Sequence, residues 1–217
     1  MNFIERIIGT FSNPDKTMED IIKEPRIEES LVIVVAYAIL AMIATYITLS
    51  HINYVVTDAS LDSNALKMIA LVFGVGGVLI MTLLAWPIVT AILHLFSMMF
   101  GGEGKIYPSM MTAIGYSQLP KLIAAVILIG MATQAPMSTV EVSSTGGYTM
   151  PNAVTGTLYW AQLAASWIFL LWSCYIGALA VKHGEKLSMK NALITVGIPL
   201  AIYVLLTFGM GYLTGLI

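Results

Sequence analysis

The strongest constraint on the fold of this chain is a series of five long apolar runs, separated by shorter polar segments. Hydrophobic residues make up 58% of the 217 residues, whereas charged residues make up only 10%. Because a soluble domain carries about a quarter charged residues, a chain this poor in charge cannot cover a water-facing surface. The sequence therefore predicts that lipid covers most of the folded chain.

The five runs have the length and composition of membrane-spanning helices. A helix of about 20 residues, rising about 1.5 Å per residue, crosses the roughly 30 Å of hydrocarbon in a bilayer. A lone strand would leave its backbone polar groups unpaired in lipid, so each run must be helical. We predict an all-α membrane protein with a transmembrane domain at residues 31–217. The predicted bundle has five transmembrane helices, at about residues 31–50, 68–100, 109–133, 158–181 and 189–217.

The distribution of Lys and Arg predicts how the chain is oriented in the membrane. Four basic residues precede the first run, Lys105 follows the second, and three more follow the fourth. On the other side, the loop at about residues 134–157 has no Lys or Arg, and Lys67 lies at a helix edge. Because loops rich in Lys and Arg stay in the cytoplasm, we predict a multi-pass cell-membrane protein. Its N-terminus is cytoplasmic and its C-terminus is extracytoplasmic.

The cytoplasmic segment at residues 1–30 has the pattern of two short amphipathic helices. Apolar residues of the first follow helical spacing, with Glu5 and Arg6 on the opposite side. Asn13 and Pro14 predict the N-cap and the first residue of the second. Such a segment either lies on the membrane surface or packs against the cytoplasmic end of the bundle. Its acidic residues outnumber its basic ones, so attraction to anionic lipid is not the expected driving force.

Three of the apolar runs contain proline. Proline removes one backbone hydrogen bond and clashes with the preceding turn, so it kinks or breaks a helix. The candidate kinks are Pro87, Pro120 and Pro199. Broken helices of this kind are also typical of transporters.

Lys121 lies inside the third run, where two placements of the helix are open. If the helix begins near Ser109, Lys121 lies about 18 Å along it, close to the bilayer centre. A charge at that depth is costly and indicates a functional site. If the span begins nearer Pro120, Lys121 is an interfacial anchor, and residues 109–119 pack in protein at the cytoplasmic edge.

The first placement predicts a polar cavity around Lys121 for an anion or a polar headgroup. Uncharged polar and titratable side chains from three runs would line it: Gln118, Tyr116, His94 and Gln162. A cavity of this kind would make the protein a transporter or channel for a small solute, an ion or a lipid. Such transport is the alternative to a non-enzymatic role as a scaffold or adaptor, in which no substrate is moved.

Catalysis and cofactor binding have no support in the sequence. The apolar runs contain no Asp or Glu, and no His-Glu-x-x-His or Gly-x-Ser-x-Gly motif occurs. The single cysteine, Cys174, has no metal-ligand spacing around it. The net charge of −2 leaves no basic excess for nucleic acid. We therefore expect no enzyme, no cofactor, no metal site and no nucleic-acid partner.

Several short motifs occur in a characteristic order relative to the five runs. They are Phe11-Ser-Asn-Pro14 and Ile21-Ile-Lys-Glu-Pro25 before the first run, Gly101-Gly102-Glu-Gly104 after the second, Tyr116-Ser-Gln-Leu-Pro120 in the third and Trp160 at the start of the fourth. In this order and spacing the chain resembles the Yip1 domain family of five-span membrane proteins, in its shorter prokaryotic form. The resemblance implies a helical bundle with a cytoplasmic N-terminus.

The resemblance also implies functions in membrane organisation. Eukaryotic members of the family are implicated in vesicle traffic, membrane shaping and binding of prenylated small GTPases, through a long cytoplasmic N-terminal region. Here that region has about 30 residues, too short for a comparable docking platform, so small GTPase binding is not expected to carry over. We predict a non-enzymatic scaffold or adaptor. Its expected partners are the lipid bilayer and membrane proteins, including further copies of itself.

Overall fold

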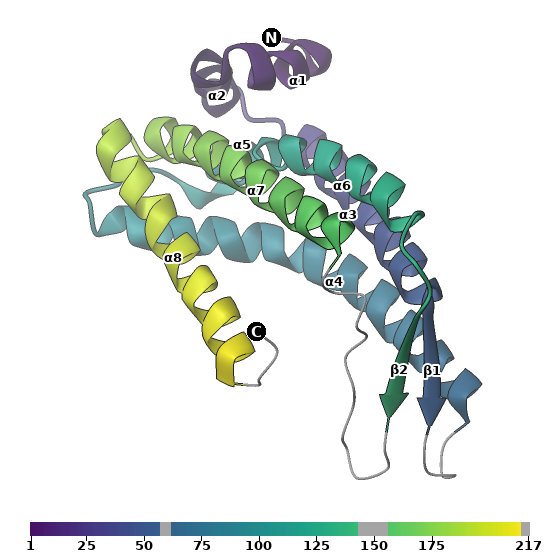
Figure 1. The fold of residues 1–217 in the computed structure, drawn as a ribbon. Helices are drawn as coiled ribbons and strands as arrows, with labels where there is room; N and C mark the ends of the chain where they lie inside the picture. Colours follow the sequence, from purple (N-terminus) through teal and green to yellow (C-terminus); the bar gives the residue numbers. More distant parts are fainter. Residues whose placement is uncertain (57–61, 143–155, 214–217) are drawn as a thin grey trace. The chain divides into compact units, whose positions relative to one another are not determined.

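The computed structural model describes residues 1–56, 62–142 and 156–213, with side chains up to residue 207. Its elements, in chain order, are α1 (Phe3–Ser12), α2 (Pro14–Lys23), α3 (Ile27–Ser50), β1 (Ile52–Val56), α4 (Ser63–Met98), η1 (Ile106–Met110), α5 (Met111–Tyr116), α6 (Leu119–Ala132), β2 (Ser138–Val142), α7 (Thr157–Gly184) and α8 (Met189–Leu213), as Figure 1 shows. Residues 214–217 of the predicted fifth span lie outside the described residues.

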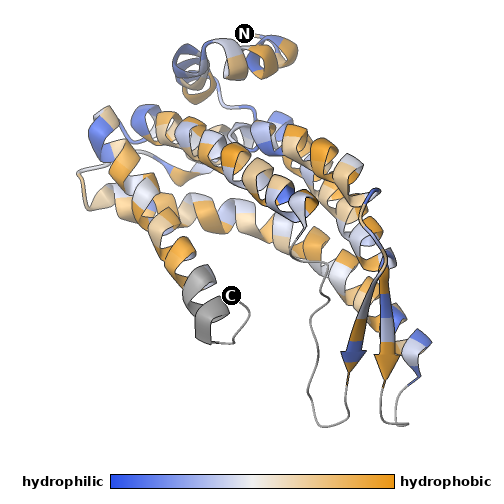
Figure 2. Cartoon of the chain, in the orientation of Figure 1, coloured by the Kyte–Doolittle hydropathy of each residue, from blue (hydrophilic) through white to orange (hydrophobic). Residues whose placement is uncertain are grey.

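The predicted all-α membrane fold is confirmed. Within the described ranges, five helical segments are long and apolar enough to cross a membrane. Figure 2 shows apolar residues along the long helices, and many of them are exposed, such as Phe73 at 75% and Leu205 at 72%. Large apolar side chains exposed along whole helices are what a bilayer requires and what water would penalise.

The chain divides into two compact units, which are described separately. The first unit consists of Met1–Ile33, Ala85–Leu119 and Leu171–Ile217. The second consists of Val34–Leu84 and Pro120–Leu170. Each unit contains one part of α3, one part of α4 and one part of α7. The N-terminal helices and the loops that follow α4 and α7 all belong to the first unit.

The short helices α1 and α2 begin where side chains cap them. The side chain of Asn2 accepts a hydrogen bond from the backbone N–H of Glu5, and the Glu5 carboxylate accepts one from Asn2, both at 2.8 Å. This reciprocal pair satisfies two backbone donors that a helix start leaves unpaired. Asn13 caps α2 and Pro14 is its first residue, as the sequence predicts.

The third apolar run contains two helices with a turn between them. Helix α5 ends at Tyr116 and α6 begins at Leu119. In the turn, the N–H of Gln118 donates a hydrogen bond to the carbonyl of Gly115, at 3.1 Å. Pro120 has no N–H to continue the α5 ladder. As the second residue of α6 it needs none, because the first N–H groups of a helix have no partner within it. Helix α6, with 14 residues, is about 21 Å long.

The other two candidate kinks lie within continuous helices. Helix α4 continues through Pro87 and α8 continues through Pro199. With 36 residues, α4 is about 54 Å long, longer than the roughly 30 Å of hydrocarbon. It must therefore tilt strongly or extend beyond the bilayer.

A parallel strand pair follows α3 and α6 in the second unit. Strand β1 pairs with β2, with Ile52 opposite Ser138 and Val56 opposite Val142 (Figure 1). The N–H of Ser138 also donates to the carbonyl of His51, at 2.9 Å. The sequence did not predict this pairing, because the two partners lie in different loops that are far apart along the chain.

Candidate functional site

Arg6 is fully buried in the first unit and is surrounded by acceptors. Its Nε atom donates to Asp20 at 3.0 Å, its Nη1 atom to Glu29 at 3.1 Å, and its Nη2 atom to the carbonyl of Glu24 at 3.0 Å. Burial lowers the pKa of Arg6, but the hydrogen bonds to Asp20 and Glu29 outweigh it, so the pKa is raised. A buried charge is tolerated only when paired in this way.

Glu29 joins α1 to the third apolar run. Its carboxylate, in the first turn of α3, accepts hydrogen bonds from Arg6 and from the hydroxyl of Tyr116, the latter at 2.5 Å. Tyr116 is fully buried at the end of α5, and the ring of Phe3 packs edge-on against it at 6.4 Å. We call Arg6, Asp20, Glu29 and Tyr116 the Arg6 cluster. It ties α1, α2, α3 and α5 together.

Helices α3 and α5 approach each other closely beside the Arg6 cluster. The hydroxyl of Ser30 donates to the carbonyl of Thr112 at 2.7 Å. A side chain at Gly115 would collide with the Ser30 side chain. This glycine is therefore needed for the close contact of the two helices, not for an unusual backbone angle.

A second polar group, the Glu185 cluster, contains Glu185, His94 and Gly104. Glu185 follows the last residue of α7 and is fully buried. One of its carboxylate oxygens lies 2.6 Å from Nδ1 of His94, in α4. The other accepts a hydrogen bond from the N–H of Gly104 at 2.9 Å.

The glycine-rich loop after α4 closes around this carboxylate. A Cβ atom at Gly102 would lie 3.0 Å from Oε2 of Glu185, and one at Gly104 would lie 2.7 Å from the same atom. The backbone N–H of Glu103 also donates to the carbonyl of Glu185, at 3.3 Å. The Gly-Gly-Glu-Gly motif thus has a packing role: it lets the backbone reach a buried carboxylate.

Asp15 connects α2 to the end of α7. Its carboxylate accepts hydrogen bonds from Nζ of Lys182 at 2.6 Å and from Nε2 of His183 at 2.9 Å. These contacts, with Lys182 contributing most and His183 next, lower the pKa of Asp15. The Asp15 side chain is 53% exposed, so water screens the interaction and its contribution to stability is small.

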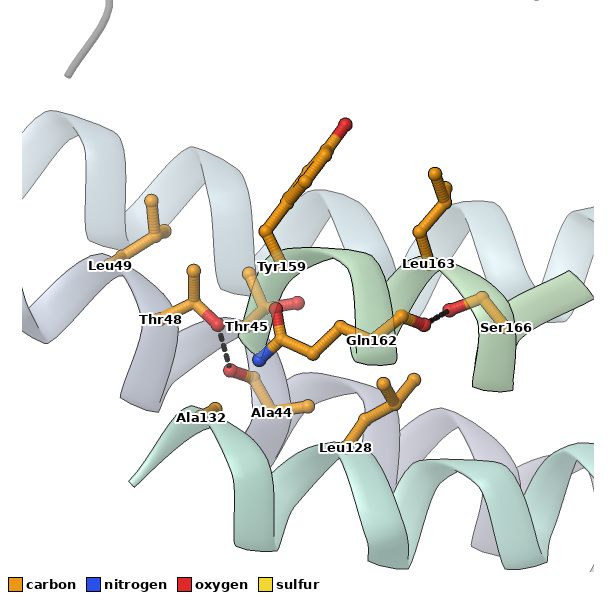
Figure 3. A pocket seen from close by; sticks show the side chains of 10 residues that line it. All are labelled: Ala44, Thr45, Thr48, Leu49, Leu128, Ala132, Tyr159, Gln162, Leu163 and Ser166. Atoms are coloured by element: carbon orange, nitrogen blue, oxygen red, sulfur yellow. Dashed lines mark hydrogen bonds between the residues drawn. The ribbon is translucent and has the colours of Figure 1, made fainter. Parts of the chain in front are cut away.

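The second unit contains a pocket of about 380 Å³. Its lining residues come from α3, α6 and α7: Ala44, Thr45, Thr48, Leu49, Leu128, Ala132, Tyr159, Gln162, Leu163 and Ser166 (Figure 3). The hydroxyls of Thr48 and Ser166 donate to carbonyls of their own helices, at 2.9 and 2.8 Å. The lining is mostly apolar and has no charged side chain.

The five residues of the predicted cavity fall into separate settings. In the first unit, Tyr116 belongs to the Arg6 cluster, His94 belongs to the Glu185 cluster, and the Gln118 amide faces the carbonyl of Ile114 at 3.5 Å. In the second unit, Gln162 lines the pocket. Lys121, the third residue of α6, is half-buried and is not among the lining residues that the structure describes.

Sequence reasoning missed the carboxylates that Tyr116 and His94 contact. Glu29 stands two residues before the start of the first apolar run, and Glu185 stands in the basic loop after the fourth. An acidic residue beside a hydrophobic segment is a signal that the sequence shows. The identity of the residue that it contacts is not visible in the sequence. Glu185 is 91 residues from His94, and Tyr116 is 87 residues from Glu29.

In both polar clusters the charged side chains form hydrogen bonds to other residues of the protein. Their contacts hold helix ends together. Among the residues that the structure describes, no group of three or more His, Cys, Asp or Glu side chains could hold a metal ion.

Comparison with known proteins agrees with the motifs. The family model described as the Yip1 domain matches residues 8–210. The chain is also 33% identical over 135 residues, 61% of its length and 89% of the relative's, to the uncharacterized protein MJ0794 of Methanocaldococcus jannaschii. No solved structure matches the chain significantly.

Proposed function

The chain belongs to the Yip1 domain family of membrane proteins, and from this premise we propose that it is a non-enzymatic scaffold or adaptor. In this role it organises the membrane or binds partner membrane proteins. The observation that carries the proposal is the Arg6 cluster, because it holds the short helices α1 and α2 in one fixed arrangement against the start of α3 and the end of α5.

A fixed polar surface favours binding of a protein partner. An interface that is ordered before binding loses less conformational entropy on association. The outward side of α2 carries Lys16, Glu19 and Lys23, which are exposed. Charges of both signs on such a surface favour recognition of a partner with a complementary pattern.

The buried charges support the same role. Arg6 and Glu185 are fully buried, and each has hydrogen-bonding partners within its own cluster. A group used in catalysis or ion movement must contact a substrate. The side chains of Arg6 and Glu185 instead contact other residues of their own clusters. Their arrangement stabilises the folded ends of the helices.

The test is site-specific photocrosslinking in membranes of the source organism. A photoreactive amino acid at Lys16 should give discrete protein adducts, whereas the same group at Phe73, exposed on α4, should give lipid adducts. Arg6→Met should reduce the Lys16 adducts, because it releases α1 from α2 and α3. The proposal fails if Lys16 gives no protein adduct while the purified protein in liposomes moves a solute or lipid at a mutation-sensitive rate.

Transport or lipid handling is the second candidate, and the pocket lined by Gln162 favours it. A liposome flux assay with ions, small solutes and fluorescent lipids tests it directly. Gln162→Leu should then lower the flux, while Gln134→Leu, an exposed glutamine outside the pocket, should not. Lys121→Met tests the charge. Equal flux in all three variants and the parent protein removes this candidate.

A further inference from the structure

Helix α1 is amphipathic, but its polar side faces the protein. Its buried residues are Arg6, Gly9 and Thr10. Ile4 and Ile8, one helical turn apart on the opposite side, are 67% and 61% exposed. A helix on a water-exposed surface is normally arranged the other way, with its apolar side buried.

The contacts of the polar side prevent α1 from rotating. Arg6 makes hydrogen bonds to Asp20, Glu29 and the Glu24 carbonyl. A side chain at Gly9 would collide with Thr17 of α2. Turning Ile4 and Ile8 inward would break the buried ion pairs and open this helix crossing. The apolar side therefore needs a cover from outside.

The end of α1 contacts the exposed apolar side of α7. The ring of Phe11 packs edge-on against Trp172 of α7, at 5.5 Å between ring centroids. Leu171, Trp172 and Tyr175 are 52%, 37% and 46% exposed. From Ile176 to Val181, in contrast, α7 is buried in the first unit.

This contact joins α1 to the part of α7 where Trp172 and Tyr175 are exposed. Trp and Tyr gather where the hydrocarbon meets the headgroups. The exposed surface of α7 within the first unit ends in such a pair, and α1 touches it there. The apolar side of α1 is thus continuous with a lipid-facing surface of a membrane helix.

We propose that α1 is an in-plane interfacial helix whose Ile4 and Ile8 side chains insert into the bilayer at the boundary between headgroups and acyl chains. Apolar burial drives the insertion. Attraction to anionic lipid does not, because Arg6 faces inward and Glu5 is the charged residue that α1 exposes. This inference goes beyond the scaffold role and stands independently of it.

The experiment uses the full chain with Cys174 replaced by alanine, reconstituted in phosphatidylcholine nanodiscs. A nitroxide spin label is attached to Ile4→Cys or Ile8→Cys, and to Glu5→Cys or Ser12→Cys as controls on the same helix. Glu5 and Ser12 are exposed polar positions. We expect relaxation by oxygen, which concentrates in lipid, to exceed relaxation by a water-soluble nickel complex several-fold at Ile4 and Ile8. The ratio should reverse at Glu5 and Ser12.

The other outcomes each overturn the proposal. If the labels at Ile4 and Ile8 respond mainly to nickel, they face water in a bilayer that contains no other protein. The apolar side of α1 would then be covered by a protein partner that the purified sample lacks. If the labels are protected from both oxygen and nickel, and the protection disappears when each nanodisc holds one chain, a second copy of the chain covers the apolar side of α1. An oxygen preference that appears only after anionic phosphatidylglycerol is added indicates charge attraction instead of apolar insertion.

Discussion

The Nδ1 atom of His94 lies 2.6 Å from Oε1 of Glu185, although the two residues are 91 positions apart. This contact joins the end of α4 to the loop after α7. The other carboxylate oxygen holds the N–H of Gly104, so one buried acid organises three segments of the first unit.

Replacing Glu185 should destabilise the protein. Glu185→Ala leaves the half-buried ring of His94 and the half-buried N–H of Gly104 without their acceptor. An unsatisfied buried group costs about 1–3 kcal/mol, and more when charge is involved. We expect a loss of about 2–3 kcal/mol in the free energy of unfolding, measured by denaturation in detergent. The control is Glu103→Ala, an exposed acid in the neighbouring loop, which should change stability by less than about 0.5 kcal/mol.

The close approach at Gly104 should make that position intolerant of a side chain. Gly104→Ala would force a methyl group into the carbonyl of Gly184 and the Glu185 carboxylate. Overpacking of this kind costs about 1–3 kcal/mol, which a fall in the thermal unfolding midpoint would report. Gly130→Ala, where a Cβ meets nothing within 4 Å, should be neutral or stabilising. Equal effects of the two substitutions would contradict the packing role of the loop.

Removing the guanidinium of Arg6 should release α1 and α2. Arg6→Met keeps the volume of the side chain but leaves the carboxylates of Asp20 and Glu29 without their buried partner. Breaking a buried ion pair costs about 3–5 kcal/mol, so limited proteolysis near residues 13–26 should become much faster than in the parent protein. Lys16→Met removes an exposed charge from the same hairpin and should leave the cleavage rate unchanged.

The contact of Asp15 with Lys182 and His183 should weaken in acid. The pKa of Asp15 is lowered below its ordinary value of 3.8, so the ionised form is favoured in the folded state. Its stabilising contribution is therefore present above the unfolded pKa and disappears as the pH falls through the lower folded pKa. The difference in unfolding free energy between the parent protein and Asp15→Asn should be fully present near pH 5. It should shrink toward zero below about pH 4, and a difference that grows in acid would reverse the sign of this linkage.

The third apolar run shows how far sequence reasoning reached into the fold. Pro120 and Lys121 indicated that a helix either crosses whole or begins midway. The structure has a turn at residues 117–118, and residues 112–117 before it are buried in the first unit. Hydropathy cannot separate these cases, because a segment buried in protein and one buried in lipid are equally apolar.

Amphipathic spacing likewise predicted the helix α1 but not what each side meets. The pattern of isoleucines opposite Arg6 was visible in the sequence. That Arg6 faces inward follows from Asp20 and Glu29, which lie 14 and 23 residues further along the chain. A helical period reports that a helix has two faces, and the partners of each face come from the rest of the fold.

The sequence by itself determined the membrane class, the positions of the apolar runs and the start of the short helix α2. These depend on local quantities, namely the free energy of placing each residue in lipid and the backbone donors that each helix start exposes. Only the tertiary structure decided that Arg6 meets Glu29, that His94 meets Glu185 and that Gly104 closes on the same carboxylate. Such pairs depend on which helix ends are brought together by packing, and their sequence separations carry no signal of that contact.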